Sequence, residues 1–135
     1  MPKIPSKDQR MLQLWGQALD EFQQIQASFP ELPIVPARAA LFYGFQRSMF
    51  LTFKTLKAFL KKEGLVPLTP KQHLEMAVQA GWIPPQEIDS WWILLMCWLE
   101  VPEVYEPEQA EALKQKIFVD SAVIFHLFKV LKQKK

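Results

Sequence analysis

Apolar residues recur along this chain at intervals of three and four positions, and no stretch alternates with a sustained period of two. Spacing near 3.6 residues is typical of amphipathic helices, so the pattern predicts an all-α protein. Prolines separate the periodic stretches, and only four glycines are present. We therefore expect an antiparallel up-and-down four-helix bundle with one short accessory helix, formed by residues 1–135 as a single domain.

Residues that begin or end helices set the expected boundaries. Ser6 is a suitable N-cap, and Thr69 followed by Pro70 is a cap with a first-turn proline. Gly64 and Gly81 suit the left-handed position that follows a helix. These signals predict helices over about residues 7–28, 37–63, 70–80, 85–101 and 107–131, the last continuing into the basic tail 132–135. The segment FPELPIVP (29–36) is expected to be an extended linker.

The second predicted helix is apolar over most of its circumference. At about 100° per residue, one tight stripe is formed by Phe42, Phe45, Met49, Phe53, Leu56 and Leu60. A separate wedge, called here the basic stripe, consists of Arg47, Lys54, Lys57 and Lys61, with Phe50 among them. A helix of this kind is central or lies at an interface. The pattern alone leaves a thick core and a dimer face as equal alternatives, and the last predicted helix has the same character.

Bulk properties restrict the class of protein. Half of the 135 residues are apolar, which is typical of a packed globule, and the net charge of +2 is too small to indicate nucleic-acid binding by itself. Cys97 is the single cysteine, and no Cys/His set has zinc-ligand spacing. The N-terminus lacks a signal-peptide core, and the longest apolar run, 91–99, is too short to span a bilayer. We expect a cytoplasmic protein with no cofactor, no metal and no membrane partner.

Two groups of residues carry a resemblance to a known family. The first is Phe45, Gln46 and Phe50, followed by LTFKTLK (51–57) and Gly64. The second group lies in the fourth predicted helix and just after it, at Trp91, Trp98, Leu99, Glu103 and Tyr105. Between them, Thr69-Pro70 and AVQAG (77–81) match a short helix that the family also has.

These residues resemble the HEPN superfamily (higher eukaryotes and prokaryotes nucleotide-binding), and within it the nucleotidyltransferase substrate-binding proteins. Members have two glutamates after the phenylalanine, then Leu-x-Trp-Lys-x-Leu-Lys and a glycine, and later the motif Arg-Asn-x-x-x-His-x-Tyr. The resemblance covers about residues 40–112. It implies a HEPN-type helical bundle.

Active members of the family are metal-independent endoribonuclease toxins that work as dimers. Their histidine takes a proton from a ribose hydroxyl, and their arginine holds the phosphate. Here Trp98 and Glu103 stand at those two positions, and Gln46 and Phe50 replace both glutamates. The expectation is a catalytically degenerate subunit. The alternative is an active RNase with a relocated site, in which Glu103 is the base and Arg47 or Lys54 holds phosphate.

The resemblance also implies partners. In the family, a minimal nucleotidyltransferase acts as antitoxin and modifies the motif tyrosine, which corresponds to Tyr105. For Tyr105 we favour a ring packed on the bundle over an exposed acceptor. The chain is expected to form a homodimer. A third hypothesis is an RNA- or nucleotide-binding helical module that uses the basic stripe, against the simpler interpretation of a solvated charged face.

Single residues outside these groups favour structural roles. His73 is expected to be exposed to solvent, and His126 to be a packing or surface residue. Cys97 is expected to be buried and unreactive. Packing is likewise the interpretation for the remaining aromatic residues of the central region, Trp82, Trp91, Trp92 and Trp98.

Overall fold

The structure is a computed structural model that describes residues 6–134. Its six α-helices are α1 (Lys7–Ser28), α2 (Ile34–Lys62), α3 (Pro70–Gln79), α4 (Ile88–Glu100), α5 (Pro107–Asp120) and α6 (Ala122–Gln133). Three 3₁₀ turns connect them, η1 (Phe29–Glu31), η2 (Pro85–Glu87) and η3 (Val101–Glu103). No strand occurs in the described part of the chain, and the prediction of an all-α fold is confirmed.

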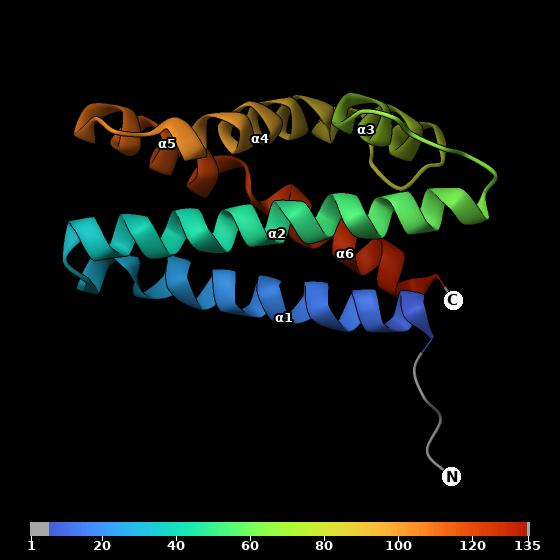
Figure 1. Ribbon diagram of the computed structural model, residues 1–135, viewed down its shortest axis with the longest axis horizontal. Helices are drawn as coiled ribbons and strands as arrows, with labels where there is room; N and C mark the ends of the chain where they lie inside the picture. The colour runs from blue at the N-terminus through green and yellow to red at the C-terminus, as the bar shows by residue number, and fades with distance from the viewer. Residues whose placement is uncertain (1–5, 135) are drawn as a thin grey trace, which may run out of the picture.

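The long helix α2 runs through the middle of the molecule. It contacts α1 on one side and α3, α4 and α5 on the other. α1 and α2 run in opposite directions, α4 returns above α2, and α5 followed by α6 leads back to the end where the chain begins (Figure 1). α6 also packs against α1. The second helix is therefore central, which is one of the two positions that its apolar pattern predicts.

Local chemistry sets most helix ends as predicted. The Ser6 hydroxyl accepts a hydrogen bond from the Gln9 amide (3.2 Å), and the Gln9 side chain accepts one from the Ser6 amide (2.9 Å). This reciprocal pair is a capping box. Thr69 caps α3 with its hydroxyl, which accepts a hydrogen bond from the Gln72 amide (3.1 Å), whereas the Gln72 side chain accepts one from the Leu68 amide (2.7 Å). Gly64 and Gly81 both adopt positive φ, +78° and +80°, a conformation that costs glycine nothing because it has no Cβ.

The predicted extended linker over residues 29–36 is wrong in most of its length. Residues 29–31 form the turn η1, and α2 begins at Ile34, ahead of Pro36. Pro36 is tolerated there because the first turn of a helix needs no backbone N–H donor. The connection between α1 and α2 is therefore tight.

The predicted continuous helix over residues 107–131 is also wrong, because it breaks at Ser121 into α5 and α6. Ser121 is buried, and its hydroxyl accepts a hydrogen bond of 2.9 Å from the side-chain amide of Gln26 in α1. The neighbouring Asp120 carboxylate accepts one of 2.9 Å from the Ser90 hydroxyl. Ser and Asp compete with the helix for hydrogen bonds, so the break lies where both side chains find partners on other helices.

Aromatic side chains dominate the core where α1, α2 and α6 meet. Phe22 is fully buried, and its ring centroid lies 6.3 Å from that of Phe45 in α2 and 6.3 Å from that of Phe125 in α6. Trp15 meets Phe128 edge-to-face at 5.1 Å.

None of the helices within residues 6–134 is long and apolar enough to cross a bilayer.

α1 and α2 approach each other closely at Gly44. A Cβ atom at this position would lie 3.2 Å from the Ile25 side chain and 3.3 Å from the Phe22 ring. Glycine is unfavourable inside a helix, by about 1 kcal/mol relative to alanine. The close contact explains why a glycine stands in the middle of α2.

Candidate functional site

A groove of about 430 Å³ lies between the N-terminal half of α2 and the connection from α4 to α5. The α2 side is formed by Val35, Arg38, Ala39, Phe42, Tyr43 and Gln46, and the opposite side by Val101, Val104, Tyr105, Glu106, Pro107 and Ala110. Gln46 and Tyr105, both expected to contact a partner, are brought together here. We call this feature the Tyr105 groove.

Two tyrosines stand at the rim of the Tyr105 groove. Tyr105 is 84% exposed and Tyr43 is 64% exposed. The favoured expectation for Tyr105, a ring packed on the bundle, is therefore wrong. Tyr105 lies in the short non-helical segment between η3 and α5. Pro107 opens α5 directly afterwards, so the segment lies outside both helices, with Val104 packed against the core and Tyr105 exposed.

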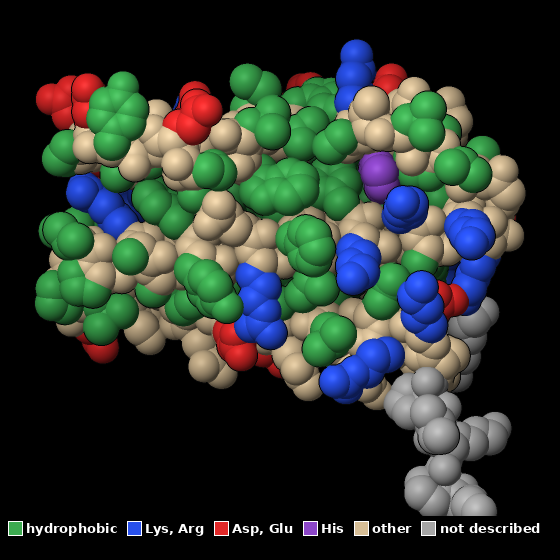
Figure 2. All heavy atoms as spheres, viewed as in Figure 1, with side chains coloured by type: hydrophobic (Ala, Val, Ile, Leu, Met, Phe, Trp, Pro, Cys, Tyr) green, Lys and Arg blue, Asp and Glu red, His purple; other side chains and the backbone are tan. Residues whose placement is uncertain are grey.

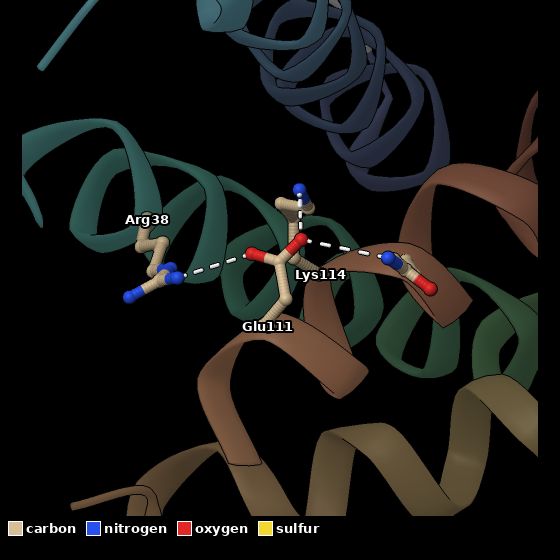
Figure 3. A network of polar contacts seen from close by, with 4 residues as sticks. Arg38, Glu111 and Lys114 are labelled. Carbon is tan, nitrogen blue, oxygen red and sulfur yellow. Dashed lines mark hydrogen bonds and ion pairs between the residues drawn. The ribbon is translucent and has the colours of Figure 1, made fainter. Parts of the chain in front are cut away.

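An ion-pair network borders the Tyr105 groove. The Arg38 guanidinium points toward Glu111 of α5 and pairs with its carboxylate at 3.0 Å, and Lys114 pairs with the same carboxylate (Figure 3). The hydrogen bond from Lys114, followed by that from Arg38, holds the pKa of Glu111 below its usual value. Arg38 Nε is buried and has no partner within residues 6–134. The network ties the N-terminal half of α2 to α5.

Trp98 and Glu103, which the sequence resemblance aligns with an arginine and a histidine, lie at a packed and at an exposed position. The indole of Trp98 stacks on the Phe53 ring, with centroids 5.1 Å apart and planes 4° from parallel. Phe53 also meets the ring of His73 edge-on at 5.5 Å. Trp98 therefore fills space between α2 and α4. Glu103 is exposed at the end of η3.

His73 is buried, so the expectation of an exposed side chain is wrong. Its Nδ1 lies 2.7 Å from the Thr69 carbonyl oxygen, and Phe53 covers the ring. Because the Thr69 carbonyl in the same helical turn is a hydrogen-bond partner for Nδ1, burial of the His73 ring costs little free energy.

The basic stripe is only partly free. Arg47 pairs with Glu21 of α1, and the Lys54 ammonium lies 5.7 Å from the centroid of the Phe50 ring. Lys57 and Lys61 are exposed and form no ion pair within residues 6–134. No hydrogen bond or ion pair in the same range joins Glu103 to Arg47 or Lys54.

Two further groups lie away from the Tyr105 groove. The Nδ1 atom of His126 in α6 is 2.9 Å from a Glu87 carboxylate oxygen, a surface pairing that links residues far apart in sequence. Cys97 is buried, as expected, and burial raises the pKa of its thiol to about 11. Within residues 6–134 no group of three or more His, Cys, Asp or Glu side chains is placed to hold a metal ion.

Comparison with protein-family models, with curated proteins and with solved structures gives no match for this chain. The site is therefore described by its own geometry: an apolar groove with two exposed tyrosines on its rim and an arginine fixed at its border. Of these residues, Arg38 and Tyr43 were not among the candidates from the sequence. The signal for Tyr43 was its spacing of seven residues from Phe50, which places both on one side of α2.

Proposed function

We propose that this chain is a catalytically degenerate HEPN-like subunit that acts by binding, and that its partner is a minimal nucleotidyltransferase. One observation supports this most directly: Tyr105 is 84% exposed at the rim of a groove that also contains Gln46. An exposed tyrosine on a short segment between helices is accessible to a second protein.

The side chains at the motif positions favour binding over turnover. Cleavage of RNA by this family needs a base for the ribose hydroxyl and a cation for the phosphate. The stacked indole of Trp98 has no positive charge, and its ring is engaged with Phe53. Glu103 carries a negative charge, which repels phosphate. Neither residue can replace the arginine that holds phosphate in active members.

In this proposal the fold is an antiparallel four-helix bundle of the HEPN type. α1, α2 and α4 are the first three helices, α5 and α6 together form the fourth, and α3 is the accessory helix. The break at Ser121 is then a bend within the fourth helix. The single-domain organisation of residues 1–135 belongs to the same proposal.

The proposed chemistry at Tyr105 is the transfer of a nucleotide. The phenolic oxygen attacks the α-phosphorus of a nucleoside triphosphate, a new oxygen–phosphorus bond forms, and pyrophosphate leaves. The phenolic proton passes to a base that the nucleotidyltransferase supplies. The Tyr105 hydroxyl forms no hydrogen bond within residues 6–134, so nothing in this part of the chain competes for it.

The test is capture of the tagged chain from its own host, followed by mass spectrometry of its partners and of the intact chain. We expect recovery of a small protein with the Gly-Ser and Asp-x-Asp nucleotidyltransferase signature. Incubation of the complex with nucleoside triphosphates should add nucleotide mass to the wild type and to Tyr43→Phe, but not to Tyr105→Phe. Tyr43→Phe is the matched control because it removes the hydroxyl of the other rim tyrosine.

Two outcomes contradict the proposal. Capture of the wild-type chain without any nucleotidyltransferase removes the proposed partner. Cleavage of RNA by the purified chain, abolished by Glu103→Gln, shows that the chain is the alternative, an active RNase with a relocated site. Cleavage that Glu103→Gln does not alter points to a contaminating RNase. In that case the capture experiment alone decides whether the proposed partner binds.

A further inference from the structure

The connection between α2 and α3 presents two aliphatic side chains to solvent. Residues 65–68, which we call the LVPL loop, are not helical. Val66 is 66% exposed and Leu68 is 81% exposed, whereas Pro67 is buried and Leu65 packs against the core. This alternation is that of an extended segment, in which successive side chains point to opposite sides. Val66 and Leu68 therefore point together away from the bundle.

Hydrogen bonds at both ends fix the LVPL loop. The Leu65 amide donates a hydrogen bond of 2.9 Å to the Leu60 carbonyl oxygen at the end of α2. The Leu68 amide donates one of 2.7 Å to the side-chain carbonyl oxygen of Gln72 in α3. The exposure of Val66 and Leu68 is therefore built into the fold. An apolar phase that covers these side chains is stabilised by the hydrophobic effect.

Lysines flank the LVPL loop on both sides. Lys57 and Lys61 lie in the last two turns of α2, and Lys71 lies in the first turn of α3. All three are exposed and form no ion pair within residues 6–134. Residues 54–75 contain five lysines and two glutamates, so the two aliphatic side chains are set in a region of net positive charge.

Two other helices end at the same place. Lys62, the last residue of α2, pairs with Asp8 at the start of α1. The Lys134 ammonium, just past α6, lies 5.3 Å from the centroid of the Trp82 ring, which follows α3. The start of α1, the connection from α2 to α3 and the end of α6 thus share one end of the molecule (Figure 1), and Figure 2 shows Lys and Arg side chains gathered over that half. We call it the basic end.

We propose that the basic end docks on the surface of a bilayer that contains anionic lipids, with Val66 and Leu68 inserted below the headgroups. Binding to a membrane surface combines buried apolar area with attraction between basic residues and anionic headgroups. The basic end supplies both in one surface. Lysine stems are long enough to keep their ammonium groups at headgroup level while the LVPL loop inserts.

The two aliphatic side chains favour a bilayer over a nucleic acid. A nucleic acid is bound by cations at its phosphates and by aromatic rings at its bases, which would leave Val66 and Leu68 uncovered. Docking of this kind needs neither a membrane-spanning helix nor a signal peptide, the two features on which the expectation of no membrane partner rested. The inference goes beyond the proposed function and does not depend on the nucleotidyltransferase.

The first test is sedimentation of the purified full chain with vesicles of two parts phosphatidylcholine and one part phosphatidylserine. We expect binding to these vesicles and none to vesicles of phosphatidylcholine alone. Leu68→Ser should weaken binding by roughly tenfold or more, because the inserted leucine is lost. The matched control is Leu99→Ser, since Leu99 is 61% exposed near the end of α4 and lies outside the basic end. Circular dichroism establishes that both variants are folded.

The second test concerns the charges. Lys61→Gln and Lys71→Gln should each weaken binding to the phosphatidylserine vesicles by about fivefold. Lys116→Gln, at an exposed lysine of α5, should leave it unchanged. Raising the salt from about 0.1 M to about 1 M shortens the Debye length from about 10 Å to about 3 Å and should weaken binding at least tenfold.

The third test measures insertion of the LVPL loop directly. An environment-sensitive fluorophore is attached at Leu68→Cys in a Cys97→Ala background. Its emission should shift to the blue when phosphatidylserine vesicles are added, because the label enters the acyl region. The same label at Val119→Cys should not shift, since Val119 is 77% exposed on α5, away from the basic end.

Four outcomes would overturn the proposal. They are absence of binding to the phosphatidylserine vesicles, equal binding to vesicles without phosphatidylserine, binding that Leu68→Ser leaves unchanged, and a label at residue 68 that does not shift. Binding of a single-stranded RNA in place of the vesicles, weakened by Lys61→Gln but not by Leu68→Ser, would show that the basic end serves nucleic acid instead.

Discussion

Replacement of Phe22 by alanine should weaken the packing of α6 on α1. The Phe22 ring is fully buried and is nearly parallel to the Phe125 ring of α6, at 7° and 6.3 Å between centroids. It also contacts Phe45 of α2. A Phe→Ala change in a core costs about 3–5 kcal/mol, because apolar contact is lost and a cavity remains.

This cost is a large share of the stability of a small domain, which is about 5–15 kcal/mol. At about 4 °C per kcal/mol for a chain of this size, Phe22→Ala should lower Tm by roughly 15 °C. Thermal unfolding followed by circular dichroism and by tryptophan fluorescence measures the shift and tests whether unfolding is two-state. The comparison is Phe118→Ala, whose ring is 36% exposed and should cost much less.

A double-mutant cycle with Phe125→Ala isolates the contact between α1 and α6. We expect a coupling free energy of about 0.5–1.5 kcal/mol, the range for aromatic pairs. A Tm decrease for Phe22→Ala no larger than that for Phe118→Ala would refute the packing argument. Additive effects of Phe22→Ala and Phe125→Ala would refute the stacked contact even if the Tm decrease is large.

Three further predictions concern single positions. Gly44→Ala should lower the free energy of unfolding, measured by urea denaturation, by about 1 kcal/mol. The reason is that overpacking costs about 1–3 kcal/mol, which exceeds the gain of about 1 kcal/mol in helix propensity. A more stable variant would contradict the close contact at 3.2 Å. The folded-state pKa of Glu111 is lowered, so its contribution to stability is present above the ordinary value of 4.5 and is lost as the pH falls through the lowered pKa. Glu111→Gln should therefore show a smaller loss of Tm in acid than the wild type. An equal loss would show that the Arg38–Glu111–Lys114 network does not cause the loss of stability in acid. Because burial raises the pKa of Cys97 to about 11, a thiol reagent at neutral pH should react with it slowly. Met96→Cys, at a position that is 61% exposed, should add one thiol that reacts fast. Fast reaction of the wild-type protein would contradict the burial of Cys97.

The helix ends that could be predicted from the sequence are those set by neighbouring residues. Ser6, Thr69, Gly64 and Gly81 act within one helical turn, through capping hydrogen bonds or positive φ. The break at Ser121 could not be predicted in this way. Its hydroxyl bonds to Gln26, which lies 95 positions earlier, and only the folded arrangement brings the two together.

The candidate site likewise contains residues that could be predicted from the sequence and residues that could not. Gln46 and Tyr105 became candidates through a family resemblance, and both line the Tyr105 groove. Arg38 was missed because its partner, Glu111, is 73 positions away on another helix. The burial of His73 was missed because the ring that covers it, that of Phe53, belongs to a different helix.

The packing of α6 on α1 has a consequence during synthesis of the chain. Among the helices within residues 6–134, the two that share the Phe22–Phe125 contact, α1 and α6, are the first and the last to be synthesised. At about 5–20 residues per second, roughly 4–14 s separate the completion of α2 from that of α6. During this interval the apolar side of α1 that α6 will cover stays open to other nascent chains and to chaperones. Truncation before α6 would make that exposure permanent, and the truncated product should be prone to aggregation and degradation.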